Sequence, residues 1–160
     1  MSDILALQTL LEQAGAARDK ALAAHRHALA SVQAAQVQAG QLAAYRLEYA
    51  DRFGKQFQQS GAIELLQCYQ GFMSRLDDAV TQQGHVVTQA AARADDAKAT
   101  LLAAELRAAS VQKLIERRTA EVTLRSDRRE QKATDEFAAR VAWQRLAAGG
   151  GPDALGFGAA

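Results

Sequence analysis

The chain has 160 residues and a formal net charge of +1, from 19 basic and 18 acidic side chains. This length is typical of one domain, and the near balance of charge gives no reason to expect the whole chain to bind a polyanion. Aromatic residues make up only 6% of the sequence, and the single proline is Pro152. Because alanine, leucine, glutamine and arginine favour helices and proline interrupts them, the composition predicts an all-α protein with very long helices.

The first predicted helix runs from about residue 3 to about residue 58, with Ser2 or Asp3 as its N-cap. Its apolar stripe consists of Leu7, Leu11, Ala14, Leu22, Leu29, Val32, Ala39, Leu42, Tyr49 and Phe53. The eleven-residue steps from Leu11 to Leu22 and from Arg18 to Leu29 predict a stutter, which would locally unwind a left-handed supercoil. We therefore expect this helix to pair along one side, less regularly than an ideal coiled coil.

One break interrupts the helical pattern, at QQSGA (58–62). Ser60 is suited to cap a helix, and Gly61 is suited to a positive φ. A loop of about four residues between two helices makes them antiparallel neighbours.

The second predicted helix runs from about residue 62 to about residue 147 and carries a heptad seam. The apolar residues spaced by seven are Met73, Val80, Val87, Ala94, Leu101, Ala108, Ile115 and Val122. The companion positions are Leu76, Gln83, Ala90, Ala97, Ala104, Val111, Arg118 and Arg125, which turn from mixed to small and then to charged. This pattern is typical of a coiled coil from about residue 73 to about residue 115.

Residues 1–147 are thus predicted to form a two-helix antiparallel coiled-coil hairpin. The first arm reaches about residue 118 of the second, so a C-terminal helical overhang of about 30 residues follows. Arg118 makes the seam polar at the same point. GGGPD (149–153) ends the helix, and residues 148–160 are predicted to be a flexible tail rich in glycine and alanine.

Large side chains are concentrated near the predicted loop. Six of the nine aromatic residues lie there, namely Tyr45, Tyr49, Phe53, Phe57, Tyr69 and Phe72. Tyr49, Phe53 and Tyr69 are expected to clamp this end, because aromatic side chains bury large areas. Each helix of a two-helix rod has only one covered face, so some of the six are expected to stay exposed for a partner.

The residues that usually carry chemistry form no recognisable catalytic, metal or cofactor site. The histidines are His25, His27 and His85, and the adjacent acidic pairs are Asp77–Asp78 and Asp95–Asp96. They are not combined at metal-ligand spacing, so we expect them to be solvated. Cys68 is the only cysteine, which excludes an intrachain disulfide, and it is expected to pack near the tip. The chain is not expected to be an enzyme or to bind a small-molecule substrate.

Residues 113–132 carry seven basic and four acidic side chains. The interleaved acids favour ion pairs four residues apart along one helix, and no aromatic residue within this segment could stack on bases. Nucleic-acid binding is therefore disfavoured. Beyond this segment Phe137, Val141 and Trp143 follow on a helix without a predicted partner, which favours docking on another protein.

The run Tyr45-Arg46-Leu47-Glu48-Tyr49, together with positions around the loop and after it, resembles the flagellar export protein FliJ family. The further matching residues are Phe53, Gly61, Tyr69, Phe72, Leu76 and Ala79, with ERR at 116–118 and RREQKATDEFA at 128–138. The resemblance covers residues 1–147. It implies an antiparallel coiled coil similar to the stalk of rotary ATPases and a non-enzymatic part of the flagellar type III export apparatus.

The resemblance also implies partners. These are a hexameric export ATPase at the end that bears the chain termini, a membrane export gate, and export chaperones, with the protein in the cytoplasm at the inner-membrane export apparatus. For the gate it points to Phe72, Leu76 and Ala79, whereas Gln83 departs from the next family position. For the ATPase we expect the basic residues of the overhang, which are Arg118, Arg125, Arg128, Arg129 and Lys132.

Two alternative functions stay open. One is a structural coiled-coil spacer or scaffold without a motor partner, and the other, weaker one is an amphipathic binder of membrane surfaces or nucleic acid that uses Arg125–Lys132. The sequence does not distinguish a flagellar system from a related injection system. The isolated chain is expected to be a monomer, with a parallel dimer through the second helix as the main alternative.

Overall fold

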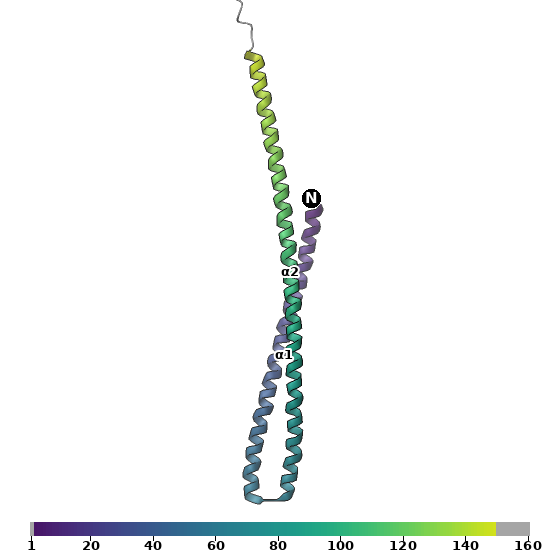
Figure 1. Cartoon of the computed structure of the whole chain (residues 1–160), viewed down its shortest axis with the longest axis vertical. Coiled ribbons are helices and arrows are strands. Elements are labelled where there is room, and N and C mark those ends of the chain that lie inside the picture. The colour runs from purple at the N-terminus through teal and green to yellow at the C-terminus, as the bar shows by residue number, and fades with distance from the viewer. Residues whose placement is uncertain (1, 150–160) are drawn as a thin grey trace, which may run out of the picture. The chain divides into compact units, whose positions relative to one another are not determined.

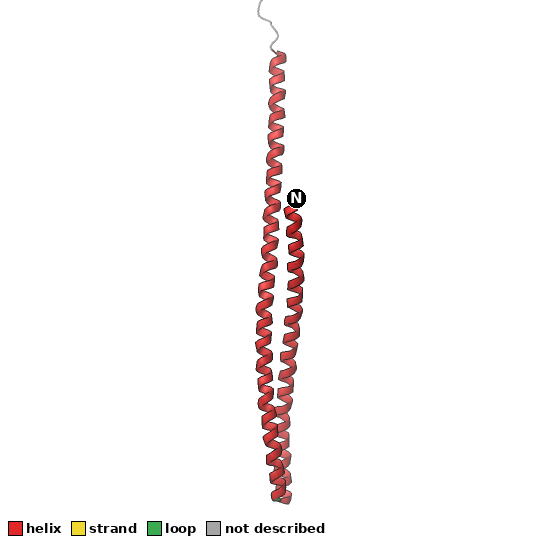
Figure 2. Cartoon of the chain, turned by 90° about the vertical axis from the view of Figure 1, so that its right-hand side faces the viewer, coloured by secondary structure: helices red, strands yellow, loops and turns green. Residues whose placement is uncertain are grey.

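The computed structural model describes residues 2–149, which form two α-helices, α1 (Ser2–Ser60, 59 residues) and α2 (Ile63–Gly149, 87 residues) (Figure 1). Helices account for all the regular structure in this range (Figure 2). The predicted all-α helical hairpin is confirmed. Of the predicted tail at 148–160, residues 148 and 149 instead belong to α2, and residues 150–160 lie outside the described part.

The connection between the helices is shorter than predicted and consists of Gly61 and Ala62. Gly61 has a φ of 59° and donates its N–H to the carbonyl of Phe57 at 2.9 Å. This is the left-handed C-terminal cap that glycine adopts without steric cost. Ser60 stays in α1, because its hydroxyl donates to the carbonyl of Gln56 at 3.3 Å, and so it does not cap α2.

Residues 8–111 form one compact unit, in which α1 and α2 lie side by side in opposite directions (Figures 1 and 2). On α2 the covered positions recur in alternating steps of three and four. These seam positions are Leu66, Tyr69, Met73, Leu76, Val80, Gln83, Val87, Ala90, Ala94, Ala97, Leu101, Ala104, Ala108 and Val111, and the half-buried Leu65, Phe72, Ala79 and Ala91 lie directly beside them. The predicted heptad seam of the second helix is therefore confirmed, and it begins one heptad closer to the turn than Met73.

On α1 the covered positions follow the same steps without a stutter, so that prediction is wrong. They are Leu11, Ala14, Ala21, His25, Ala28, Val32, Ala35, Ala39, Leu42, Arg46, Tyr49 and Phe53, with the exposed Arg18 completing the series. Leu29 is 49% exposed and Leu22 lies beside the seam. Ala21 and Ala28 occupy the seam one position before each leucine, because a small side chain lets the helices approach closely.

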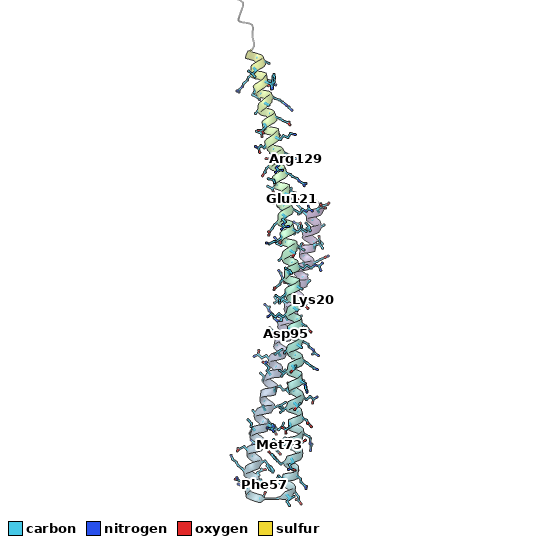
Figure 3. The ribbon with its side chains drawn as sticks, viewed as in Figure 1. Lys20, Phe57, Met73, Asp95, Glu121 and Arg129 are labelled. Carbon is cyan, nitrogen blue, oxygen red and sulfur yellow. The ribbon has the colours of Figure 1, made fainter. Side chains whose placement is uncertain are left out.

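The core of the unit is built mainly from alanine. Its buried hydrophobic residues are Ala14, Ala21, Ala35, Leu76, Ala94, Leu101 and Ala108. An alanine side chain buries little apolar area, so each such layer contributes little hydrophobic stabilisation. Larger side chains gather at the joined end, where Figure 3 labels Phe57 and Met73. We therefore expect the aromatic end to contribute more stability per residue than the alanine-rich stretch.

Residues 2–7 and 112–149 form the second unit. Ile4 and Leu7 of α1 and Ile115 of α2 are half-buried. From Glu116 to Gly149 every residue is exposed except the half-buried Val141. The covered seam of α2 thus ends at Ile115, next to the change in polarity that the sequence shows at Arg118.

Candidate partner-binding surfaces

The six aromatic residues beside the turn form one connected cluster. The Phe53 and Tyr69 rings stack with centroids 3.7 Å apart and planes 12° apart, and Tyr49 lies 4.1 Å from Phe72. Tyr49 also stacks on Tyr69 at 6.3 Å. These contacts join α1 to α2, which confirms that Tyr49, Phe53 and Tyr69 clamp this end. Aromatic pairs of this kind add about 0.5–1.5 kcal/mol beyond the area they bury.

The cluster is incompletely covered. Tyr45 is 48% exposed although its ring meets Phe72 edge to face at 6.4 Å. Phe57 is also exposed, and among the described aromatic rings its ring meets that of Phe53, on its own helix, at 5.8 Å. Cys68 is exposed rather than packed, so the expectation for this residue is wrong. The tip therefore presents aromatic surface beside an accessible thiol.

The stripe of Phe72, Leu76 and Ala79 is only partly accessible. Leu76 is buried, at 7% exposure, and belongs to the seam. Phe72 and Ala79 are half-buried, and Phe72 packs against rings of α1. Of the three residues proposed for gate contact, the two that flank Leu76 are the ones a partner could touch.

Gln83 lies inside the hairpin. Its side chain is buried at 8% exposure, and its Nε2 donates to the carbonyl of Ala35 at 3.0 Å. A small residue on α1 lets the amide reach the backbone of the opposite helix. The pattern of the second helix already placed Gln83 on the seam, but not the hydrogen bond that satisfies it.

A second polar contact crosses between the helices, from Arg46 Nε to Asp77 Oδ1. Asp77 was expected to be solvated, and its side chain is indeed 51% exposed, but it also pairs with Arg46. The hydrogen bond to Asp77, and then the attraction of its charge, raise the pKa of Arg46 above its ordinary value. His25 is likewise half-buried at a seam position, not fully solvated. Counting back by sevens from Phe53 would have found both Arg46 and His25.

The basic residues of the overhang are exposed and mostly unpaired. Arg118 forms an ion pair with Glu121 at 3.3 Å. The other four are Arg125, Arg128, Arg129 and Lys132, and none has a carboxylate within ion-pair distance among residues 2–149. The predicted pairing four residues apart is therefore not formed at these four side chains. Figure 3 labels Glu121 and Arg129 on this stretch.

Apolar side chains are exposed on the same stretch of α2. A shallow groove is lined by Gln112, Ile115, Glu116, Thr119, Ala120, Thr123, Leu124 and Asp127. Farther along, Trp143 and Leu146 are 75% and 73% exposed. Exposed large side chains beside unpaired cations are typical of a surface that binds another macromolecule.

Among residues 2–149, no cluster of three or more histidine, cysteine or acidic side chains is placed to hold a metal ion. Neither described helix contains a stretch apolar enough to cross a lipid bilayer.

The fold and these surfaces define a class of protein: an α-helical hairpin with an aromatic cluster beside the turn, polar contacts across the seam and an exposed basic stretch of helix. Comparison with family models identifies the particular family, because the model described as "Flagellar FliJ protein" matches residues 2–147. The chain belongs to the flagellar FliJ family. It is therefore a non-catalytic component of the flagellar type III protein export apparatus. No match was found among curated proteins or among solved structures.

Proposed function

We propose that the protein couples the hexameric export ATPase to the membrane export gate and escorts export chaperones in the cytoplasm. The observation that carries this proposal is the unpaired basic helix after residue 118. Arg125, Arg128, Arg129 and Lys132 are exposed and have no carboxylate partner among residues 2–149, which suits a partner that supplies the carboxylates. Because the chain belongs to the flagellar FliJ family, we expect this partner to be a component of the export apparatus.

The ATPase is proposed to bind Arg118, Arg125, Arg128, Arg129 and Lys132. Exposed ion pairs are worth about 0–1 kcal/mol each and are screened by salt. Such contacts break and re-form at small cost, which suits a helix held in a ring whose subunits change state in turn. Binding is therefore expected to be modest and to weaken as ionic strength rises.

The gate is proposed to bind the stripe of Phe72, Leu76 and Ala79. Phe72 and Ala79 would supply the contact, while the buried Leu76 holds α2 in place beneath them. The exposed Tyr45 packs against Phe72 and would extend the same surface onto α1. Aromatic residues with half-covered rings are common anchors of protein interfaces.

ATP hydrolysis by the export ATPase tests the proposal. Full-length chain should stimulate hydrolysis, and a chain truncated after Arg118 should not, because it lacks the other four basic residues. A variant with Arg125, Arg128, Arg129 and Lys132 all changed to glutamine is the matched control, since it keeps the helix length. Undiminished stimulation by both variants would rule out the overhang as the ATPase site. Failure of the full-length chain to stimulate would favour a structural spacer.

A further inference from the structure

The seam phase of α2 continues through the overhang although nothing covers it. The positions that continue the steps of three and four are Val122, Arg125, Arg129, Lys132, Glu136, Ala139, Trp143 and Leu146, and all are exposed. The large apolar members stand at the two ends of this series, with charged residues between them. Charged residues at seam positions weaken a coiled coil unless the partner helix offers complementary side chains, so these residues decide which partner fits.

A parallel second copy does not fit this surface. In a parallel pair each seam residue faces its own equivalent, so Arg125, Arg129 and Lys132 would each meet a like charge, and Glu136 would meet Glu136. Like charges at facing positions destabilise helix pairs.

An antiparallel second copy fits in one register, which is centred at the level of Thr134. Positions of the two seam series then face each other across the pair. Val122 meets Leu146, Arg125 meets Trp143, Arg129 meets Ala139 and Lys132 meets Glu136. Two-fold symmetry makes each of these contacts twice.

Each contact in this register is chemically complementary. Val122 and Leu146 exclude water from each other, and the Arg125 guanidinium lies over the Trp143 indole as a cation–π pair. The Arg129 stem covers Ala139 while its charged end stays in water. Lys132 and Glu136 form an ion pair, and neither has an ion-pair partner within the described part of its own chain.

We propose that residues 122–146 of α2 pair with the same residues of a second copy of this chain, antiparallel and in this register. The pair is short and contains few apolar contacts, so we expect a dissociation constant of about 100 µM. The monomer expected from the sequence is then the form present at protein concentrations well below this dissociation constant. If the proposed ATPase site is correct, self-pairing also covers Arg125, Arg129 and Lys132 and competes with the ATPase.

Charge reversal in the full-length chain tests the pairing, with association measured by sedimentation equilibrium and by the fluorescence of Trp143, the only tryptophan. Lys132→Glu and Glu136→Lys should each weaken self-association about tenfold, because two ion pairs become two repulsions. An equimolar mixture of the two variants should restore it. Asp127→Lys is the matched control, since this residue lies on the opposite side of the helix, and it should change association less than about twofold.

Cysteine crosslinking tests the direction and the register. In a Cys68→Ala background, Val122→Cys and Leu146→Cys variants are mixed and oxidised. Disulfides should join a Val122→Cys chain to a Leu146→Cys chain. Disulfides only between identical variants, a monomer up to about 1 mM, or no rescue in the mixed charge variants would each overturn the proposal. ATPase stimulation is measured separately with Glu136→Lys, because Glu136 is not part of the proposed ATPase site whereas Lys132 is. Loss of self-pairing with intact stimulation in this variant leaves the proposed function standing.

Discussion

The substitution Leu76→Ala distinguishes a structural role of the stripe of Phe72, Leu76 and Ala79 from a role in binding the export gate. Leu76 is one of only two buried leucines in a core made mainly of alanine. Truncating a buried leucine costs about 2–5 kcal/mol, depending on how well the site collapses. A seam between two helices has open sides, so neighbouring side chains can move in. We therefore expect a loss near the lower limit, about 2–3 kcal/mol of unfolding free energy.

Urea unfolding followed by far-UV circular dichroism measures this loss. Leu76→Met is the matched control, because it keeps the volume and should cost less than about 1.5 kcal/mol. Ala79→Ser adds a hydroxyl at a half-buried flank and is expected to change the free energy by less than about 1 kcal/mol. A loss below about 0.5 kcal/mol for Leu76→Ala would contradict the burial on which the reasoning rests.

Binding to the export gate is then measured under conditions in which every variant is folded. Because Leu76 is buried whereas Phe72 is half-buried and Tyr45 is exposed, Leu76→Ala should keep gate affinity within about threefold, while Phe72→Ala and Tyr45→Ala should each lose about tenfold or more. If folded Leu76→Ala loses gate binding as severely as Phe72→Ala, then Leu76 contacts the gate directly and the tip must open to expose it.

Three further predictions concern polar and reactive side chains. Gln83→Ala should lower the unfolding free energy by about 1 kcal/mol through loss of its hydrogen bond. Gln83→Leu should be nearly neutral, because the Ala35 carbonyl keeps its own helical partner. Equal losses for the two variants in urea unfolding would contradict this. Cys68 is exposed, so a maleimide should label it in the folded chain nearly as fast as in urea. The interaction with the Asp77 carboxylate raises the pKa of Arg46, so its contribution to stability is lost as the pH rises above the ordinary range of arginine. About pH 7 and about pH 10 both lie below that range and above the range in which carboxylates are protonated, so Arg46→Gln should show the same stability deficit at both; a deficit that vanishes at the higher pH would contradict this.

Much of the fold is determined by local sequence. The long proline-free stretch and its helix-forming residues specify two helices, and the glycine at 61 supplies the one left-handed position that a tight turn needs. A turn of two residues leaves the following helix no direction except back along the first. The seam of α2 could also be predicted from the sequence, since its large apolar residues lie at heptad positions.

The seam of α1 was decided by packing and not by hydrophobicity. Leu22 and Leu29 are more hydrophobic than Ala21 and Ala28, yet the alanines are more deeply covered. Close approach of two helices favours small side chains at the contact, and a leucine beside the seam can still cover its edge. A prediction that assigns the largest side chains to the seam is therefore displaced by one residue and produces an apparent stutter.

Polar contacts across the hairpin likewise depended on tertiary structure. Nothing in the sequence pairs Arg46 with Asp77 or Gln83 with Ala35, which are 31 and 48 residues apart in the chain. The open sides of a two-helix seam let such side chains remain partly hydrated or reach a backbone carbonyl, so polar residues are tolerated where a globular core would exclude them. The sequence by itself determined which residues are helical and where the chain turns back; the tertiary structure decided which faces meet, because that choice rests on how closely two particular backbones can approach.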